Sequence, residues 1–282
     1  MGHHKLSYIC GLMTIPTINL LQEGISFQTE GKIWKIITDH SSSLLVIQVR
    51  DGEAYQTSFT AIDTMKSSIL WQDYTLDENW WLGMSSLHQG VLLLHTYPDA
   101  QKPQPRGIVA LDVASKEIIW QNQDLNFYEL ADDKIVATSS TTSDQFYLTV
   151  DIKSGNILER FQEFDKEFTR KNENNSMIFP FHYQNEMAYF QTVAVFLKKK
   201  INLQIVQAVD YLEYDNFIII SYFYDDADGL MNNLLVLDQN GEVLLHQNIE
   251  KQLIGIGLDT FFVFKNELFF VKHKTLLRSL KF

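Results

Sequence analysis

A strand–turn–strand phrase that recurs four times is the feature that most constrains how this chain can fold. Residues 57–72 read TSFTAIDTMKSSILWQ and residues 106–121 read RGIVALDVASKEIIWQ, and looser copies follow at 146–162 and 233–248. Each copy has an apolar segment, an aspartate, a short polar turn and a second apolar segment. Because internal repeats are typical of propellers and other stacked architectures, the phrase predicts a series of similar sheets.

The phrase encodes a hairpin. An aspartate at the end of a strand accepts hydrogen bonds from nearby backbone N–H groups and starts a turn. Gly155 and Gly241 supply a positive φ in the third and fourth copies, whereas Ser67 and Lys116 occupy that place in the first two. We therefore expect antiparallel strand pairs in all four copies, with altered or strained turns in the first two.

The tryptophans of the first two copies indicate how neighbouring units meet. Trp71 stands eight residues after Asp63, and Trp120 stands eight residues after Asp112. A tryptophan at the far end of a hairpin offers a large face for packing on the next unit.

The spacing of the aspartates predicts the number of units. They stand at positions 63, 112, 151 and 238, and the last step of 87 residues is about twice the length of a propeller blade, ~40–45 residues. A unit without the aspartate should therefore lie between Gly155 and Asn216. Residues 188–207 (AYFQTVAVFLKKKINLQIVQ) offer a strand pair there, with Lys198, Lys199 and Lys200 at the hairpin tip.

The two ends of the chain are predicted to share one sheet. The segments after Gln247 are one strand short of a four-stranded unit, and residues 25–29 (ISFQT) can complete it, which would leave no open sheet edge. We predict an all-β, six-bladed β-propeller closed by this N-terminal strand, with an N-terminal arm at 1–24 and a single domain at 25–282. Five or seven blades, or two β-sandwich domains, stay open as alternatives.

Two resemblances support this fold. GIVALDVASKEIIW and FTAIDTMKSSILW resemble the repeats of quinoprotein-type β-propellers, which are also WD40-like in architecture. IWKI, VIQVRD, ENWWLG, YLEYD, SYFYDD and DTFFVF resemble a bacterial family of six-bladed propellers known only as a domain of unknown function. The second resemblance implies the fold and no activity, cofactor or catalytic residue.

Composition limits the partners and the compartment. A net charge of −12 disfavours nucleic acid and anionic lipid surfaces, and no stretch approaches the ~20 apolar residues of a membrane span. Cys10 is the single cysteine, which fits a reducing compartment. We expect a cytoplasmic protein; secretion or a periplasmic location stays open because residues 6–21 weakly resemble a signal peptide.

No cofactor is predicted, because nucleotide-binding and nucleophile motifs are missing and the eight histidines show no metal-ligand spacing. The alternative is calcium at Asp225, Asp226 and Asp228, where DDADG echoes part of a calcium loop; an acidic hairpin turn is the simpler interpretation.

Several side chains are candidates for ligand binding. Trp80 and Trp81 follow Asp77 and Glu78, so an aromatic ring beside carboxylates could bind a cation, although packing between blades is the simpler explanation of the rings. The other candidates are Arg50 and Asp51 at a turn, and Tyr211 and Glu213 on a strand expected to line the central channel.

Function is predicted only as a class. We expect a non-catalytic scaffold that binds an unknown protein or small ligand on a face rich in acidic loops. The alternatives are a hydrolase or lyase with carboxylates at the channel mouth and, third, a quinone-dependent dehydrogenase, for which the chain is short.

Overall fold

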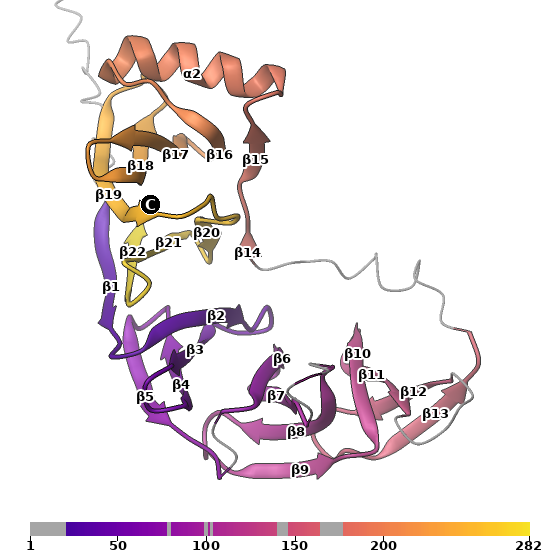
Figure 1. Ribbon diagram of the computed structural model, residues 1–282. Coiled ribbons are helices and arrows are strands. Elements are labelled where there is room, and N and C mark those ends of the chain that lie inside the picture. Colours follow the sequence, from indigo (N-terminus) through magenta and orange to yellow (C-terminus); the bar gives the residue numbers. More distant parts are fainter. Residues whose placement is uncertain (1–20, 78–79, 99–100, 102–103, 140–145, 164–176) are drawn as a thin grey trace, which may run out of the picture.

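The computed structural model describes residues 21–77, 80–98, 101, 104–139, 146–163 and 177–282, whose strands form five antiparallel sheets (Figure 1). Sheet I contains β2 (Lys32–Thr38), β3 (Leu44–Asp51), β4 (Gln56–Asp63) and β5 (Ser68–Tyr74). Sheet II contains β6 (Leu82–His88), β7 (Val91–Thr96), β8 (Arg106–Asp112) and β9 (Ile118–Asn122). Sheet III contains β10 (Leu125–Ala131), β11 (Lys134–Ser139), β12 (Tyr147–Asp151) and β13 (Ile157–Phe161).

Two further sheets have five strands each. Sheet IV runs in the order β15 (Phe181–Gln184), β16 (Val206–Tyr214), β17 (Phe217–Asp226), β18 (Gly229–Asp238) and β19 (Val243–Leu253). Sheet V runs in the order β1 (Gln22–Gln28), β22 (Leu276–Lys281), β21 (Glu267–Lys272), β20 (Phe261–Phe264) and β14 (Met177–Ile178). Helix α2 (Ala188–Ile201) connects β15 to β16.

Apolar clusters join the sheets face to face in the order IV, V, I, II, III. Leu234 and Val236 of sheet IV pack with Phe270 of sheet V, and the next cluster joins sheets V and I. Two more clusters join sheet I to II and sheet II to III. Figure 1 shows the sheets following one another around an arc. The protein is therefore an all-β assembly of successive sheets.

The repeated phrase forms the hairpin that the sequence predicts. The four aspartates each end the last strand but one of sheets I, II, III and IV, in the order Asp63, Asp112, Asp151 and Asp238. Asp112 Oδ1 accepts the Ser115 N–H at 2.7 Å, and Asp151 Oδ1 accepts the Ser154 N–H at the same distance. The aspartates thus occupy equivalent positions and brace equivalent turns.

The residues that replace glycine in the first two copies carry the expected strain. Ser67 has a φ of 49° and Lys116 a φ of 64°, close to the 70° of Gly155 and the 79° of Gly241. A residue other than glycine in this left-handed region lowers the free energy of unfolding by about 1–2 kcal/mol.

Lys116→Gly is therefore expected to stabilise the protein. Relief of the strain exceeds the extra flexibility of glycine in the unfolded chain, for a net gain of about 0.5–1 kcal/mol in the free energy of unfolding. Urea denaturation would measure it. The control is Lys153→Gly, at an exposed turn residue that is not among the positive-φ positions, where no gain is expected. Equal gains at both positions would contradict the explanation.

The tryptophans tie neighbouring sheets together, as predicted. Trp71 of sheet I donates its Nε1–H to the Val113 carbonyl beside sheet II, at 2.7 Å. Trp120 of sheet II makes the same bond to Ile152 beside sheet III, at 2.8 Å. Each ring therefore combines apolar packing with one directional bond between sheets.

The predicted pairing of the chain ends is present. β1 pairs with β22, where Ser26 lies opposite Arg278 and Phe27 opposite Leu277. β1 begins at Gln22, and the division into an arm and one domain stays a prediction.

The predicted count of six blades is not confirmed, since the described residues form five sheets and these do not close into a ring. The prediction of a strand pair at 188–207 is wrong, because most of this segment is helix α2. Phe190, Val193 and Leu197 form its buried stripe at helical spacing. The helix packs on the face of sheet IV that does not meet sheet V, where a further blade would otherwise pack.

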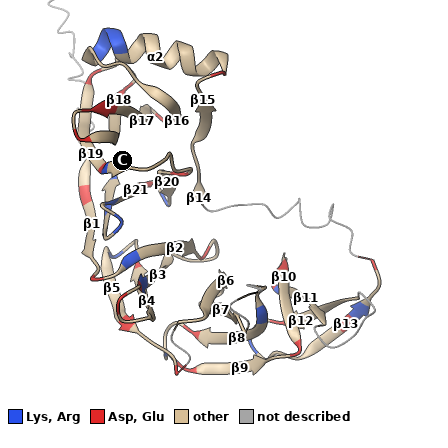
Figure 2. Ribbon diagram, in the orientation of Figure 1, with Lys and Arg blue, Asp and Glu red and all other residues tan. Residues whose placement is uncertain are grey.

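The three lysines lie in the last turn of α2 and not at a hairpin tip (Figure 2). Positive charge in that position interacts favourably with the helix dipole. Of the helices in the described part of the chain, none has the length and apolar character to cross a membrane.

Candidate functional site

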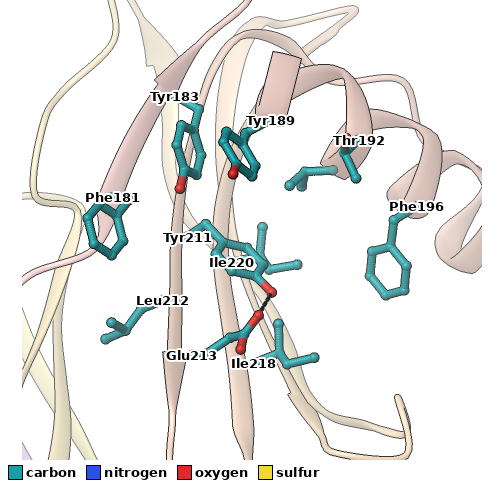
Figure 3. Close-up of a pocket in the computed structure, with 11 residues that line it drawn as sticks. Phe181, Tyr183, Tyr189, Thr192, Phe196, Tyr211, Leu212, Glu213, Ile218 and Ile220 are labelled. Carbon is teal, nitrogen blue, oxygen red and sulfur yellow. Dashed lines mark hydrogen bonds between the residues drawn. The ribbon is translucent and has the colours of Figure 1, made fainter. Parts of the chain in front are cut away.

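A pocket of about 650 Å³ lies between helix α2 and sheet IV (Figure 3). β15, α2, β16 and β17 all contribute to its wall. The lining residues are Phe181, Tyr183, Tyr189, Thr192, Val193, Phe196, Tyr211, Leu212, Glu213, Ile218 and Ile220. Its volume lies within the range of ligand sites, and its lining is mostly apolar and aromatic with few polar groups.

The pocket follows from how α2 is anchored. The buried stripe of the helix packs on Val209, Tyr222 and Leu235 of sheet IV. Tyr189 and Phe196 lie outside that stripe and remain exposed, by 67% and 36%. Tyr189 lies beside Tyr183 of β15 and Phe196 lies on the opposite side of the pocket, so a space that the helix does not fill remains between them.

Three aromatic rings form one wall. Phe181 and Tyr183 of β15 are stacked with 6.4 Å between ring centroids and 15° between planes. Tyr183 also stacks on Tyr189 of α2, with 5.2 Å between centroids. Parallel rings present their faces to a flat or cationic group.

Tyr211 and Glu213, both predicted site residues, lie in this pocket. They are two residues apart on β16 and therefore point to the same face of the sheet. The Tyr211 hydroxyl donates to Glu213 Oε1 at 2.5 Å. Burial raises the pKa of Tyr211, and the hydrogen bond to Glu213 raises it further, so the phenol stays protonated.

Glu213 gives the pocket its charge. It is the one carboxylate among the described residues that line the space, and these residues include no Lys, Arg or His. Its side chain is exposed, so a carboxylate braced by one hydroxyl is available to a cation within reach of the aromatic wall.

The structure brings two of the predicted site residues, Arg50 and Trp80, into contact with each other. The guanidinium carbon of Arg50 lies 4.7 Å from the ring centroid of Trp34 and 5.5 Å from that of Trp80. Arg50 also donates to the Leu82 carbonyl at 3.2 Å. Burial lowers the pKa of Arg50. Arg50 thus lies against the Trp80 ring, and ligand binding at these two residues stays a prediction.

The neighbouring predicted residues do not converge on one point. Asp51 Oδ1 accepts the N–H groups of Glu53 and Ala54, so it caps its own turn. Trp81 is 38% exposed and meets Trp80 edge to face at 6.4 Å. Asp77 lies at an exposed bend, and Glu78 lies outside the described residues. Ligand binding at these positions stays a prediction.

The acidic stretch near residue 226 is a tight hairpin. β17 ends at Asp226 and β18 begins at Gly229, so Asp228 belongs to a two-residue turn. Asp226 Oδ1 accepts the Ala227 N–H at 2.8 Å. Asp225 and Asp226 are adjacent on a strand and point to opposite faces. Calcium binding by these three carboxylates stays a prediction.

The structure brings together one pair of polar residues that the sequence did not predict. His182 of β15 lies opposite Asp210 of β16, and its Nδ1 lies 2.6 Å from Asp210 Oδ1. Asp210 is fully buried, and its Oδ2 also accepts two bonds from Thr260. Only the pairing of β15 with β16 brings these residues together, and no motif in the sequence signals it.

The protein is thus an all-β assembly of propeller-like sheets. Its pocket between α2 and sheet IV has an aromatic wall and one carboxylate, Glu213. The family model described as Domain of unknown function (DUF4905) matches residues 38–120, which lie in sheets I and II. The resemblance to a domain of unknown function is thereby confirmed over that segment.

The chain is similar to several solved structures at low identity, and no curated protein matches it. BamB from Moraxella catarrhalis has 10% identity and a TM-score of 0.39, covering 93% of this chain and all of that one. A duf4221 family member from Bacteroides vulgatus has 9% identity and a TM-score of 0.36, covering 93% of this chain and 97% of that one. The Dos1 propeller has 12% identity and a TM-score of 0.33, covering 93% and 76%.

Proposed function

We propose that the protein is a non-catalytic binding scaffold whose pocket, between α2 and sheet IV, accepts a basic and apolar segment of a partner protein. The observation that carries the proposal is the stacked wall of Phe181, Tyr183 and Tyr189 facing the Tyr211–Glu213 pair. An aromatic wall beside a carboxylate suits a lysine or arginine side chain with an apolar neighbour.

Two further features favour a peptide. β15 is an edge strand of sheet IV, paired with β16 on one side, and an extended peptide can add to such an edge. The net charge of −12 attracts basic partners and speeds their association. Phe181, on this edge strand, is 67% exposed and available as a contact.

The test is peptide selection on the immobilised full-length protein, followed by affinity measurement with variants. Selected peptides are expected to share a basic residue next to an apolar one. Glu213→Gln should weaken them about 10-fold, since a charged hydrogen bond contributes ~1.5–3 kcal/mol. Glu242→Gln, at an exposed glutamate in the turn between β18 and β19 and outside the pocket, is the matched control and should leave affinity unchanged.

Two results would contradict the pocket as the site. One is equal binding by the parent and by Glu213→Gln. The other is a loss of binding in Asp226→Lys with none in Glu213→Gln, which would favour the acidic loop face predicted from the sequence. That face, with Asp225, Asp226 and Asp228, is the second surface we propose for a partner. A cytoplasmic location stays part of the proposal, supported by the single Cys10.

A second candidate function, a hydrolase or lyase, is favoured by the His182–Asp210 pair. The Nδ1 contact with Asp210 orients the ring, and His182 Nε2 is buried without a hydrogen-bond partner. A ring nitrogen held in this way can act as a general base. Because Nε2 contacts no nucleophile in the described part of the chain, we rank this function second.

A further inference from the structure

Turns from three successive sheets meet at a second polar cluster. His40 lies in the turn between β2 and β3, His88 ends β6, and Asp133 lies in the turn between β10 and β11. These are equivalent turns of sheets I, II and III. His40 and His88 are 48 residues apart, close to the 49 residues between Asp63 and Asp112, so the repeat itself brings the two histidines together.

The cluster is tightly arranged around a buried carboxylate. Asp39 is fully buried, and its Oδ1 lies 4.0 Å from His88 Nδ1. The rings of His40 and His88 are stacked, with 4.4 Å between centroids. One ligand atom each from Asp39, His40 and His88 lies within 4.8 Å of the others. Ser41 and the Gly90 N–H hold the Asp39 carboxylate in place by hydrogen bonds.

Asp133 determines which nitrogen of His88 is free. Its Oδ1 lies 2.9 Å from His88 Nε2, and a carboxylate at that position selects the tautomer with the proton on Nε2. The lone pair then resides on Nδ1, which is buried and has no hydrogen-bond partner. The His88 side chain is only 2% exposed. Nδ1 and Asp39 Oδ1 therefore face each other as two acceptors, an arrangement that a cation between them would satisfy.

We propose that Asp39, His40 and His88 bind a divalent transition-metal ion of the zinc type, with Asp133 as the positioning carboxylate behind His88. Two imidazoles and one carboxylate suit zinc and its neighbours, whereas calcium and magnesium prefer oxygen ligands alone. His40 is exposed, so the fourth position opens to water. The carboxylate–histidine–metal arrangement is the one that zinc sites commonly use.

Metal binding requires the His40 ring to rotate as well as approach, because a metal ion lies in the plane of each imidazole that binds it and the two rings are stacked at 11°. Tetrahedral zinc has bonds of ~2.0–2.1 Å to nitrogen, so its ligand atoms lie about 3.4 Å apart. His40, on an exposed turn, can tilt toward His88 to reach that spacing. The ion would then join the turns of sheets I and II directly and hold sheet III through Asp133.

The test is titration of the full-length protein with Co²⁺ alone, followed by Zn²⁺. His3 and His4 are replaced by alanine in every sample, because an adjacent pair of histidines can bind metal independently. One equivalent of Co²⁺ is expected to give the intense visible absorption of a four- or five-coordinate site, and Zn²⁺ should abolish it.

Variants connect the signal to the cluster. His40→Ala, at an exposed residue, should weaken Co²⁺ binding at least 10-fold, and Asp133→Asn about 10-fold or more, with the metal-free thermal midpoint unchanged in both. His273→Ala, at a half-exposed histidine elsewhere, should bind as the parent does. Weak, octahedral Co²⁺ absorption, or equal affinity in His40→Ala and the parent, would overturn the proposal.

Discussion

Trp120→Ala is expected to lower the free energy of unfolding by about 3 kcal/mol, the low end of the cost of deleting a core aromatic ring, because Trp120 is partly buried. The ring packs on the apolar cluster between sheets II and III, so its loss opens a cavity at a joint between sheets. Its Nε1–H also satisfies the Ile152 carbonyl, which would lose its partner. Urea denaturation measures the change.

Gly155 shows how closely that joint is fitted. A Cβ atom built on Gly155 would lie 2.6 Å from the Trp120 ring, so only glycine allows the ring to rest there. Trp120→Phe keeps an aromatic ring and deletes the donor, and should cost about 1–2 kcal/mol. Trp34→Ala is the control, because Trp34 is 63% exposed and contacts Arg50 through its ring face alone. A cost in Trp120→Ala no larger than in Trp34→Ala would show that the joint does not depend on the ring.

Local sequence predicts the hairpins well, because their geometry is encoded within a dozen residues. An aspartate, a turn and a following apolar segment specify the same structure at Asp112 and Asp151 regardless of what surrounds them. The pairing of β1 with β22 was also predictable, since an incomplete C-terminal unit requires a strand from elsewhere.

Helix α2 could not be separated from a strand pair by composition. Its β-branched and aromatic residues favour a strand, yet Phe190, Val193 and Leu197 also fit a helix, and a short apolar run fits both. Tertiary packing decides between them, because α2 covers a face of sheet IV that meets no other sheet among the described residues. Because α2 was not predicted, the part of the pocket that it forms was not predicted either. Tyr211 and Glu213 were therefore predicted as site residues without the aromatic wall beside them.

Long-range polar pairs were beyond prediction for a related reason. His40 and His88 have no ligand spacing along the chain, and they become neighbours only once the repeat is folded into adjacent sheets. Aligning the copies on their aspartates places both histidines at the same turn, which is the signal that could have found them.

Asp210→Ala is expected to destabilise the protein by about 3 kcal/mol or more, because it leaves buried polar groups without partners. Asp210 is fully buried and accepts hydrogen bonds from His182 within sheet IV and from Thr260, which directly precedes β20 of sheet V. The carboxylate therefore joins two sheets, and its loss strands the donors on both sides. Thermal and urea denaturation of the variant measure the effect.

Asp210→Asn refines the test. Its amide keeps one acceptor but points its N–H₂ group at a donor, so we expect about half of the stability loss of Asp210→Ala. Asp228→Ala, at an exposed turn, is the control and should change stability by less than about 0.5 kcal/mol. His182→Gln separates a structural role of His182 from a catalytic one. A glutamine can still donate to Asp210, so the variant should largely keep the stability of the parent protein while any hydrolase activity disappears. If both Asp210 variants stay as stable as Asp228→Ala, the Asp210 carboxylate does not join the two sheets.

If, in addition, the two Asp210 variants and His182→Gln all lose a hydrolytic activity that the parent protein has, the His182–Asp210 pair serves catalysis. The enzyme function then replaces the proposed binding scaffold.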